Sequence, residues 1–428
     1  MTGNKVKNSL RASYWDGVFN ACMQGFTTEF LTPYALALKA SVSQIGVLSA
    51  LPNLFSSLCQ LKSADVSERY RSKKKVVVSF VLLHALMGVP IILTPYLFKG
   101  FEVTALIVCV TLFTALNGLA LPIWMSLMSD YLPSRKRGSY FGWRARITGI
   151  VTVTCMLSAG GILQLFRSVP LRGFLVIFSI AFLCRVCSWY SLTRMHEPPF
   201  RSRHDSYFSI VDFLRRAKDS NFARFVILAA CLNFSVYLAS PFFSVFMLRD
   251  LKFSYITYTT LITTVTLASI FTIGRWGNIS DKTGNLKVIK VSAFFIATIP
   301  LWWLVNHHPA YLLFVQILSG CVWVGFNLCA VNFVYDAVTP AKRTRCLAYY
   351  NVCNGLAICL GSLIGGFLAR TLPLLGGYRL LSLFLLSSMC RFTVAFLMRG
   401  IIKEVRQVEH ISNRDLFYSM VGLRPMLE

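Results

Sequence analysis

Twelve long apolar stretches dominate this sequence. They lie near residues 15–38, 42–61, 76–98, 101–128, 146–166, 171–192, 224–247, 254–275, 288–306, 309–335, 347–369 and 379–399. A helix needs about 20 apolar residues to cross the roughly 30 Å hydrocarbon core of a bilayer. Only 14% of the residues are charged, whereas soluble domains carry about 25%. The sequence therefore predicts an all-α integral membrane protein with twelve transmembrane helices and excludes a soluble globular protein.

The distribution of basic residues predicts the orientation of these spans. The chain has 43 Lys and Arg against 17 Asp and Glu, a net charge of +26. If the amino terminus lies inside, 33 basic residues fall on cytoplasmic segments and 8 on the opposite side. Cytoplasmic loops of membrane proteins are enriched in Lys and Arg. We therefore expect both termini in the cytoplasm, and the positive charge gives no reason to invoke a nucleic acid.

The longest hydrophilic connection divides the chain into two groups of six spans. The predicted organisation is a first six-helix bundle at 1–192, a cytoplasmic central loop at 193–223, a second bundle at 224–402 and a cytoplasmic tail at 403–428. From 207 to 225, the apolar residues Ile210, Val211, Leu214 and Phe222 lie among the basic residues Arg215, Arg216 and Lys218. This pattern suits either a helix lying on the inner membrane surface or a plain solvated linker.

Similar segments recur in the two halves at a nearly constant spacing. Asp130 to Arg137 reads DYLPSRKR and Asp336 to Arg343 reads DAVTPAKR, 206 residues later. Glu29 to Pro33 in the first span matches Tyr237 to Pro241 in the seventh, 208 residues later. Such self-similarity indicates duplication of a six-helix unit.

These segments also resemble a known family. Gly277-Asn-Ile-Ser-Asp281-Lys282-Thr-Gly284, between spans 8 and 9, is similar to the signature loop G-x-L-A-D-[RK]-x-G of the major facilitator superfamily. The segment from Asp130 to Gly142 resembles the loop after span 4 in many bacterial members. The resemblance implies two pseudo-symmetric six-helix bundles, with spans 1, 4, 7 and 10 lining a central cavity, and a bacterial inner membrane.

The sequence departs from the family pattern at three places. Leu61 replaces the leading Gly of the signature in the first half, and the loop at Asp65 lacks the trailing Gly. Span 4 has no Arg, and Asn117 is its strongest polar group. Span 5 has no Gly-Pro run. The first departure removes a close-packing glycine, and the absences in spans 4 and 5 weaken an assignment as a drug/proton antiporter.

Acidic and basic residues at the ends of the cytoplasmic loops are candidates for a conformational latch. The candidate pairs are Asp281 with Lys282, Asp65 with Arg69, Asp130 with Arg137, and Asp336 with Arg343, with Gly277 and Gly284 shaping the signature loop. Exposed ion pairs contribute roughly 0 to 1 kcal/mol each, so only a network could bias a conformation. The alternative is that these charges simply hold the topology.

Polar residues recur at helical spacing in three of the spans expected to line a cavity. The stripes are Gln316, Gly320, Trp323 and Asn327 in span 10; Asn233, Tyr237, Ser240 and Ser244 in span 7; and Thr114, Asn117 and Trp124 in span 4. Most steps are three or four residues, which place each set on one helix face. Polar groups are costly in hydrocarbon, so each stripe is expected to line the substrate cavity or to bond to a neighbouring helix.

Few ionisable residues are predicted to lie inside spans. Glu29, about half-way along span 1, could bind a cationic substrate or carry a proton, or could be paired and hold two helices together. Arg144 and Arg146, at the start of span 5, could attract an anionic substrate or contact phospholipid. Arg185 and Arg391, 206 residues apart in spans 6 and 12, are expected to reach an interface or to pair with a buried acid.

The most specific functional prediction is a secondary transporter. We expect a monomer that moves a small organic solute by alternating access, with the bilayer and the solute as partners and no cofactor or metal. Proton coupling through Glu29 and facilitated diffusion are both open. No G-x-x-x-x-G-K-[ST] motif is present, and His84, His307 and His308 have no spacing typical of an enzyme. The alternative is a transporter-fold protein that acts as a pigment or lipid carrier, an assembly factor or a sensor.

Overall fold

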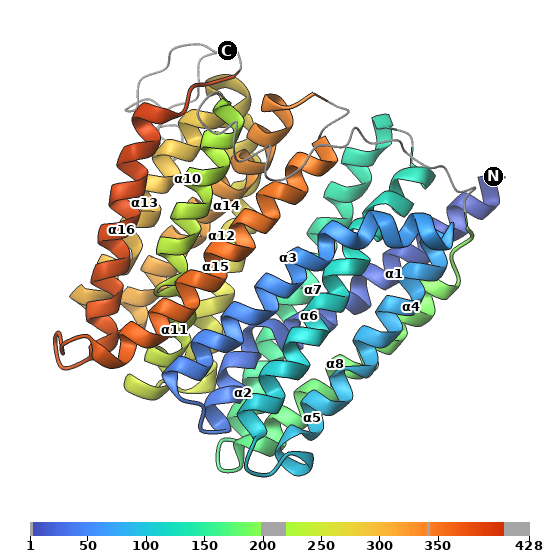
Figure 1. Cartoon of the computed structure of the whole chain (residues 1–428). Coiled ribbons are helices and arrows are strands. Elements are labelled where there is room, and N and C mark those ends of the chain that lie inside the picture. The colour runs from blue at the N-terminus through green and yellow to red at the C-terminus, as the bar shows by residue number, and fades with distance from the viewer. Residues whose placement is uncertain (1–2, 133, 198–219, 340–342, 406–428) are drawn as a thin grey trace. The chain divides into compact units, whose positions relative to one another are not determined.

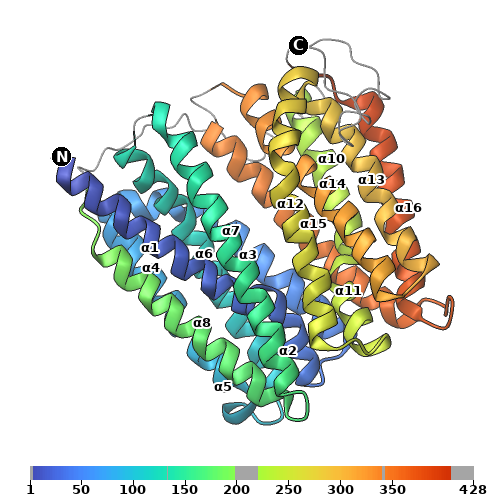
Figure 2. The same ribbon diagram turned by 180° about the vertical axis from the view of Figure 1, so that it is seen from behind.

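The computed structural model describes residues 3–132, 134–197, 220–339 and 343–405. In these ranges the chain is almost entirely helical and has no β-strand (Figures 1 and 2). The elements are α1 (Gly3–Thr27), η1 (Thr28–Phe30), α2 (Leu31–Ala37), α3 (Val42–Tyr70), α4 (Lys73–Leu86), α5 (Gly88–Leu97), α6 (Glu102–Tyr131), α7 (Ser134–Leu165), α8 (Pro170–Thr193), α10 (Asn221–Tyr237), α11 (Ser240–Val245), η3 (Phe246–Asp250), α12 (Tyr255–Thr283), α13 (Asn285–Val305), α14 (Pro309–Ala337), α15 (Arg343–Thr371) and α16 (Arg379–Ile401).

Eleven helical segments in the described ranges are long and apolar enough to cross a bilayer. The remaining predicted span corresponds to α1, η1 and α2, and α1 packs along α7 and α8 (Figure 2). This segment is less apolar than the others because α1 carries polar residues such as Ser13, Asp16 and Asn20 on one face. The prediction of an all-α membrane protein is confirmed.

The chain divides into two compact units. Unit 1 comprises Met1–Arg203, Ser240–Thr263 and Ile358–Thr371, and unit 2 comprises His204–Ala239, Thr264–Ala357 and Leu372–Glu428. Unit 1 thus includes short segments from the predicted second half of the sequence. The predicted surface helix at 207–225 and the tail at 403–428 lie mostly outside the described residues.

Unit 1 is built on helix pairs that approach closely. α6 packs against α3 and α4, α4 also packs against α8, and α1 packs against α7 and α8. A Cβ placed on Gly118 of α6 would lie 2.6 Å from the Ser56 hydroxyl of α3. A larger residue at this position would therefore force the two helices apart.

Unit 2 has a similar arrangement of long helices. α13 packs against α14 and α16, and α10 packs against α16. A Cβ on Gly320 of α14 would meet the backbone carbonyl of Val265 in α12. The predicted stripe residue Gly320 is therefore a close-packing position between two helices.

Spans 1 and 7 are interrupted at matched places in the repeat. η1 separates α1 from α2, and Leu238 and Ala239 separate α10 from α11. Pro33 and Pro241 lie just beyond these breaks. Proline has no backbone N–H and so cannot complete the hydrogen bond to the carbonyl four residues before it. A proline at the matched place in each span therefore accounts for the break in both.

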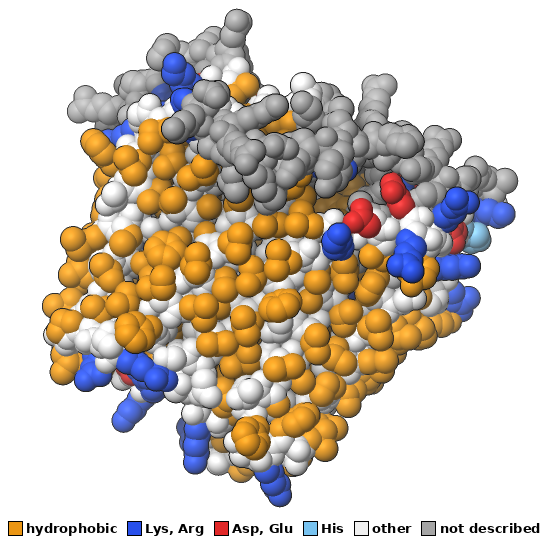
Figure 3. Space-filling model, viewed as in Figure 1, with side chains coloured by type: hydrophobic (Ala, Val, Ile, Leu, Met, Phe, Trp, Pro, Cys, Tyr) orange, Lys and Arg blue, Asp and Glu red, His pale blue; other side chains and the backbone are white. Residues whose placement is uncertain are grey.

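Hydrophobic side chains cover much of the surface seen in Figure 3, and Lys and Arg lie towards its upper and lower edges. Large apolar residues such as Phe271 and Phe396 are 77% and 73% exposed. In water such exposure would be unfavourable, whereas against lipid it needs no further cover. The surface therefore agrees with a membrane-embedded chain.

Candidate functional site

At the break in span 1, the side chain of Glu29 is exposed and its backbone carbonyl is bound by another helix. Pro33 cannot donate to the Glu29 carbonyl, and the Tyr258 hydroxyl of α12 donates to it instead, at 2.7 Å. The same hydroxyl lies 3.2 Å from the Ser244 hydroxyl of α11. No residue in the described ranges forms a hydrogen bond or ion pair with the Glu29 carboxylate, which is exposed. Here the backbone makes the contact between helices, and the carboxylate remains open to a ligand or a proton.

The predicted stripe of α14 runs from a buried to an exposed end. Gln316 and Gly320 are buried, Trp323 is half-buried and Asn327 is exposed. The Trp323 ring packs edge-on against Phe326, with 6.1 Å between the ring centroids. Only the Trp323 and Asn327 end of this stripe is therefore open to a ligand in this structure.

The predicted stripe in span 7 includes a contact between helices. The side-chain amide of Asn233 in α10 donates to the Asn354 side-chain oxygen of α15 at 3.0 Å. Tyr237 ends α10 and Ser240 begins α11, so they flank the break in this span. Asn233 therefore bonds to a neighbouring helix, which was the predicted alternative to lining a cavity.

The predicted stripe in span 4 leads towards a buried cation. In α6, the Thr114 hydroxyl donates to the backbone carbonyl of Val110 at 2.8 Å, and Asn117 is half-buried. Trp124 is buried, and its ring lies 4.5 Å from the guanidinium carbon of Arg144. Of this stripe, Trp124 is the residue that meets ionised groups.

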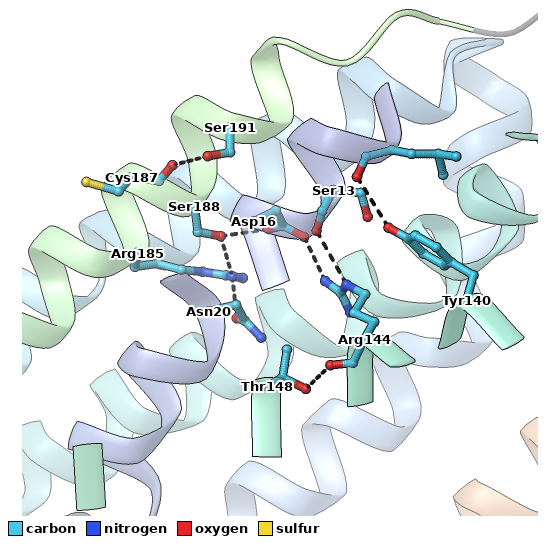
Figure 4. Close-up of polar contacts among 11 residues, drawn as sticks. Ser13, Asp16, Asn20, Tyr140, Arg144, Thr148, Arg185, Cys187, Ser188 and Ser191 are labelled. Carbon is cyan, nitrogen blue, oxygen red and sulfur yellow. Dashed lines mark hydrogen bonds and ion pairs between the residues drawn. The ribbon is translucent and has the colours of Figure 1, made fainter. Parts of the chain in front are cut away.

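A buried ion pair joins α1 to α7 in unit 1. The carboxylate of Asp16 and the Arg144 guanidinium are 3.2 Å apart, and their side chains are only 7% and 16% exposed. The Ser188 hydroxyl of α8 donates to the other carboxylate oxygen of Asp16 at 2.8 Å. Figure 4 shows these groups meeting between three helices. Burying ions in a membrane-spanning region is expensive unless they are paired, and such groups usually have a function.

Arg185 of α8 extends this cluster and is 4% exposed. Its Nη1 donates to the Asn20 side-chain oxygen at 2.6 Å and to the Ser188 hydroxyl at 3.2 Å. Its Nε donates to His84 Nδ1 at 3.0 Å. The Nδ1 atom of His84 accepts this bond and therefore carries no proton. Arg185 therefore reaches Asp16 through Ser188 and does not extend to a membrane interface. We call Asp16, Asn20, His84, Arg144, Arg185 and Ser188 the polar cluster of unit 1.

The Arg144 guanidinium is held along one edge. Its Nη2 donates to Asp16, and its Nε donates to the Ser13 carbonyl at 3.4 Å. A Cβ on Gly17 would lie 2.7 Å from both nitrogens, so the glycine makes room for this edge. Among the described residues, Nη1 of Arg144 has no hydrogen-bond acceptor.

Arg391 of α16 occupies the place in the repeat that matches Arg185, but its surroundings differ. It is 2% exposed. It donates to the Ser387 hydroxyl at 3.0 Å and to the backbone carbonyls of Ile296 and Val236 at 3.1 and 3.2 Å. No acidic residue in the described part of unit 2 forms an ion pair with it. Among the residues that the structure describes, the buried ionised cluster therefore lies in unit 1.

Two of the predicted latch carboxylates bond to the start of a neighbouring helix. Asp130, at the end of α6, lies 2.6 Å from the Lys73 ammonium at the start of α4. Asp336, at the end of α14, accepts a hydrogen bond of 2.6 Å from the side-chain amide of Asn285 at the start of α13. These contacts occupy matched places in the repeat and link neighbouring helices within each unit.

The remaining latch candidates are arranged differently. Asp65 lies 3.6 Å from Lys62 rather than beside Arg69, and both members of that pair are exposed. The guanidinium of Arg343 lies over the Tyr335 ring, 5.8 Å from its centre. Asp281 and Lys282 are exposed at the end of α12. The side chain of Arg137 lies outside the described part of the structure.

The two signature glycines have different environments. Gly284 has φ of 86°, which only glycine adopts readily, and lies between α12 and α13. A Cβ on Gly277 would meet nothing within 4 Å. In the first half, Arg71 ends α3 with φ of 47° without the help of a glycine.

Comparison with known proteins identifies the family. The model of the Major Facilitator Superfamily matches residues 17–362 and, in a second match, residues 225–412. These matches span nearly all the described helices. The chain belongs to the major facilitator superfamily. Members of this superfamily are membrane transporters rather than enzymes, and this chain has their fold.

Solved superfamily structures share this fold at low sequence identity. The nucleoside transporter NupG superposes with a TM-score of 0.70 at 15% identity, covering 92% of this chain and 99% of that one. A D-xylose-proton symporter gives 0.72 at 12% identity, covering 94% and 99%. A bacterial homologue of the human lysosomal transporter Spinster gives 0.68 at 13% identity, covering 95% and 100%. A search of curated proteins finds no match to the sequence.

Sequence reasoning missed the acidic centre of the polar cluster. Ser13, Asp16 and Asn20 are spaced three and four residues apart and therefore share one face of α1. This polar stripe resembles those predicted in spans 4, 7 and 10, but it lies around the middle of α1 and straddles the predicted start of span 1. The convergence with Arg144, from a distant helix, needed the tertiary structure.

Proposed function

We propose that this superfamily transporter carries a small organic solute across the membrane by alternating access. The observation that carries the proposal is a junction within unit 1 between α3 and the last part of α15. The Ser43 hydroxyl donates to the Gly366 carbonyl at 2.9 Å, and the Ser362 hydroxyl donates to the Ser49 hydroxyl at 3.2 Å. The predicted topology places this junction at the end of the spans away from the cytoplasm.

The junction is built from small residues and hydrogen bonds, one of which the Arg370 guanidinium donates to the Ser41 hydroxyl at 3.0 Å. A Cβ on Gly46 would lie 2.6 Å from the Ser362 carbonyl and 3.2 Å from the Gly366 Cα, so the two backbones touch. Each neutral hydrogen bond contributes roughly 0.5 to 1.5 kcal/mol net. Two conformations that exchange differ by only a few kcal/mol. A contact of this strength is suited to opening and closing during each transport cycle.

The break in span 1 is a second contact in unit 1, and it involves a titratable residue. Tyr258 binds the Glu29 backbone at the break, so a change in η1 acts directly on the contact between η1 and α12. We propose Glu29 as the group that binds a proton or a cationic part of the solute, with a gradient as the energy source. The proposed setting is a monomer in a bacterial inner membrane with both termini in the cytoplasm.

Solute counterflow in proteoliposomes tests transport directly. Purified protein is reconstituted, the vesicles are loaded with an unlabelled candidate solute, and uptake of the labelled solute is followed without an imposed ion gradient. We expect transient accumulation that is absent from protein-free vesicles. If candidate solutes bind saturably but none of them shows counterflow, the carrier or sensor alternative is favoured.

Two glycine variants test the junction in the same assay. Gly46→Leu places a side chain between α3 and α15 and is expected to abolish counterflow while the protein remains folded. Gly161→Leu is the matched control, because a Cβ on that glycine meets nothing within 4 Å. Equal counterflow by both variants would refute the role of the junction.

The coupling role of Glu29 is tested by Glu29→Gln. If the carboxylate carries a proton, this variant should retain counterflow and lose uptake driven by a pH gradient. Normal gradient-driven uptake with an unchanged pH dependence would exclude that role.

A further inference from the structure

We propose that the Arg144 guanidinium in unit 1 binds the carboxylate of a small organic anion, which makes this transporter specific for an anionic solute. The inference rests on the proposed transport function and names the class of substrate. It places the anion at the polar cluster, between α1, α6 and α7, and it assigns Arg185 and Asp16 to positioning Arg144 and its surroundings.

The first argument is the charge of the polar cluster. Its described ionisable residues are two arginines and one aspartate, because His84 accepts a hydrogen bond from Arg185 and is neutral there. The cluster therefore holds one positive charge in excess. An unbalanced ion buried in a membrane-spanning bundle is costly. A bound anion would balance this charge.

The second argument is the unequal use of the two guanidinium groups. Arg185 is 4% exposed and donates to three side chains, whereas the Arg144 side chain is 16% exposed and donates along one edge only. Its Nη1 has no acceptor on any residue that the structure describes. A guanidinium binds a carboxylate through two parallel N–H groups. The side of the Arg144 guanidinium that carries Nη1 can therefore bind a carboxylate in this way.

Arg391 provides an internal comparison. It too is buried, but it donates to one hydroxyl and two backbone carbonyls through all three of its nitrogens. A buried arginine can thus be satisfied in this fold by neutral groups of the protein. Arg144 has instead one ionised partner and an unused nitrogen, which distinguishes a binding group from a structural one.

The third argument concerns the organic part of the anion. The Trp124 ring lies 4.5 Å from Arg144 and packs edge-on against Phe141, with centroids 6.2 Å apart. On the adjoining faces of α1 and α7, Tyr14 and Trp143 stack with 5.3 Å between their centroids. Aromatic rings beside a guanidinium suit a carboxylate that carries a flat or apolar body better than an inorganic anion.

A phospholipid head group offers an anion of the same charge. Arg146 lies two residues along α7 from Arg144 and is exposed. It is therefore the residue that a lipid phosphate at the surface would contact. Comparing variants at these two positions separates a site at the polar cluster from attraction of lipid to the surface.

The test measures stabilisation of the purified full chain against heating in detergent. The probes are benzoate, acetate, succinate and inorganic phosphate, with benzamide as the uncharged match for benzoate. A ligand that binds only the folded state raises the melting temperature with concentration. We expect benzoate or another of the carboxylates to stabilise the protein, and benzamide and phosphate to bind at least about tenfold more weakly, since a hydrogen bond to an ion contributes roughly 1.5 to 3 kcal/mol.

Three variants locate the effect. Arg144→Gln should weaken carboxylate binding about 10- to 100-fold, and Arg144→Lys should weaken it less. Arg146→Gln should bind as the wild type does. Because Arg144→Gln leaves Asp16 without its ion pair, Asp16→Asn/Arg144→Gln serves as a charge-balanced variant that should fold and also fail to bind.

Several outcomes would overturn the inference. These are no stabilisation by any carboxylate, equal stabilisation by benzamide, unchanged carboxylate binding in the charge-balanced variant, or loss of all carboxylate binding when phosphatidylglycerol is added. Counterflow tests the transport function separately. Counterflow of a neutral solute that is unaffected by Arg144→Gln would refute the anion site and leave the transport function standing. Carboxylate binding without counterflow would refute the transport function and leave the anion site standing.

Discussion

Removal of the Asp16 charge should destabilise the protein strongly. Asp16→Asn keeps the side-chain size and one acceptor for Ser188, so the main loss is the negative charge between Arg144 and Arg185. Breaking a buried ion pair by removing one partner costs about 3 to 5 kcal/mol. This variant leaves two arginines without a compensating charge, so we expect a loss in that range.

Removal of the Arg144 charge should destabilise the protein less than removal of the Asp16 charge. Arg144→Gln leaves Asp16 with the Ser188 hydrogen bond and with Arg185 behind it. We expect a loss of about 1 to 3 kcal/mol, typical of an unmade hydrogen bond to a charged group. The double variant should be more stable than the sum of the single effects predicts, by at least about 1 kcal/mol, because it removes both charges.

Reversible unfolding in mixed micelles measures these differences. Dodecyl sulfate is added to protein in a neutral detergent, and tryptophan fluorescence follows unfolding of the wild type, the two single variants and the double variant. Arg146→Gln controls for a changed charge on the detergent-bound surface. Additive effects within about 0.5 kcal/mol, or an Asp16→Asn variant as stable as the wild type, would refute the reasoning that the ion pair is buried and coupled.

Three further substitutions test close contacts, each by the same unfolding measurement. Gly160→Ala places a Cβ against a side chain of α12 and should cost about 1 to 3 kcal/mol, while the neighbouring Gly161→Ala, with open space, should not destabilise. Gly284→Ala should cost about 1 to 3 kcal/mol because of its positive φ, whereas Gly277→Ala should be neutral or slightly stabilising; the reverse order would contradict the assigned backbone. Tyr258→Phe removes the hydrogen bond to the break in span 1 and should cost about 1 kcal/mol; no loss would mean that this bond adds nothing to stability.

Hydropathy predicted the helices well, but not the full extent or continuity of each one. The first span was predicted from residue 15, whereas α1 begins at Gly3, because its first turns are polar and hydropathy reveals only the part that suits lipid. The span predicted at 76–98 is divided at Met87 into α4 and α5. The sequence Gly88-Val-Pro90 carries the signal for that break, which a hydropathy window averages away.

The candidate site was less accessible to sequence reasoning. Spacing along one helix predicted which polar residues share a face, but it could not tell a hydrogen bond between helices, as at Asn233, from an exposed group such as Asn327. The partner of Arg144 lies 128 positions earlier in the chain. A contact of that separation depends on helix packing, and no local pattern in one sequence reports it.

The two matched arginines have consequences for how the halves of this protein can change during evolution. Arg391 is held largely by backbone carbonyls, which every substitution at those positions retains. Arg185 is held by the side chains of Asn20, His84 and Ser188, each of which a single codon change can replace. Of the two matched arginines, one is thus held largely by groups that every substitution retains, and the other by groups that a substitution can replace. A change of solute would therefore need fewer compensating changes around Arg185 than around Arg391.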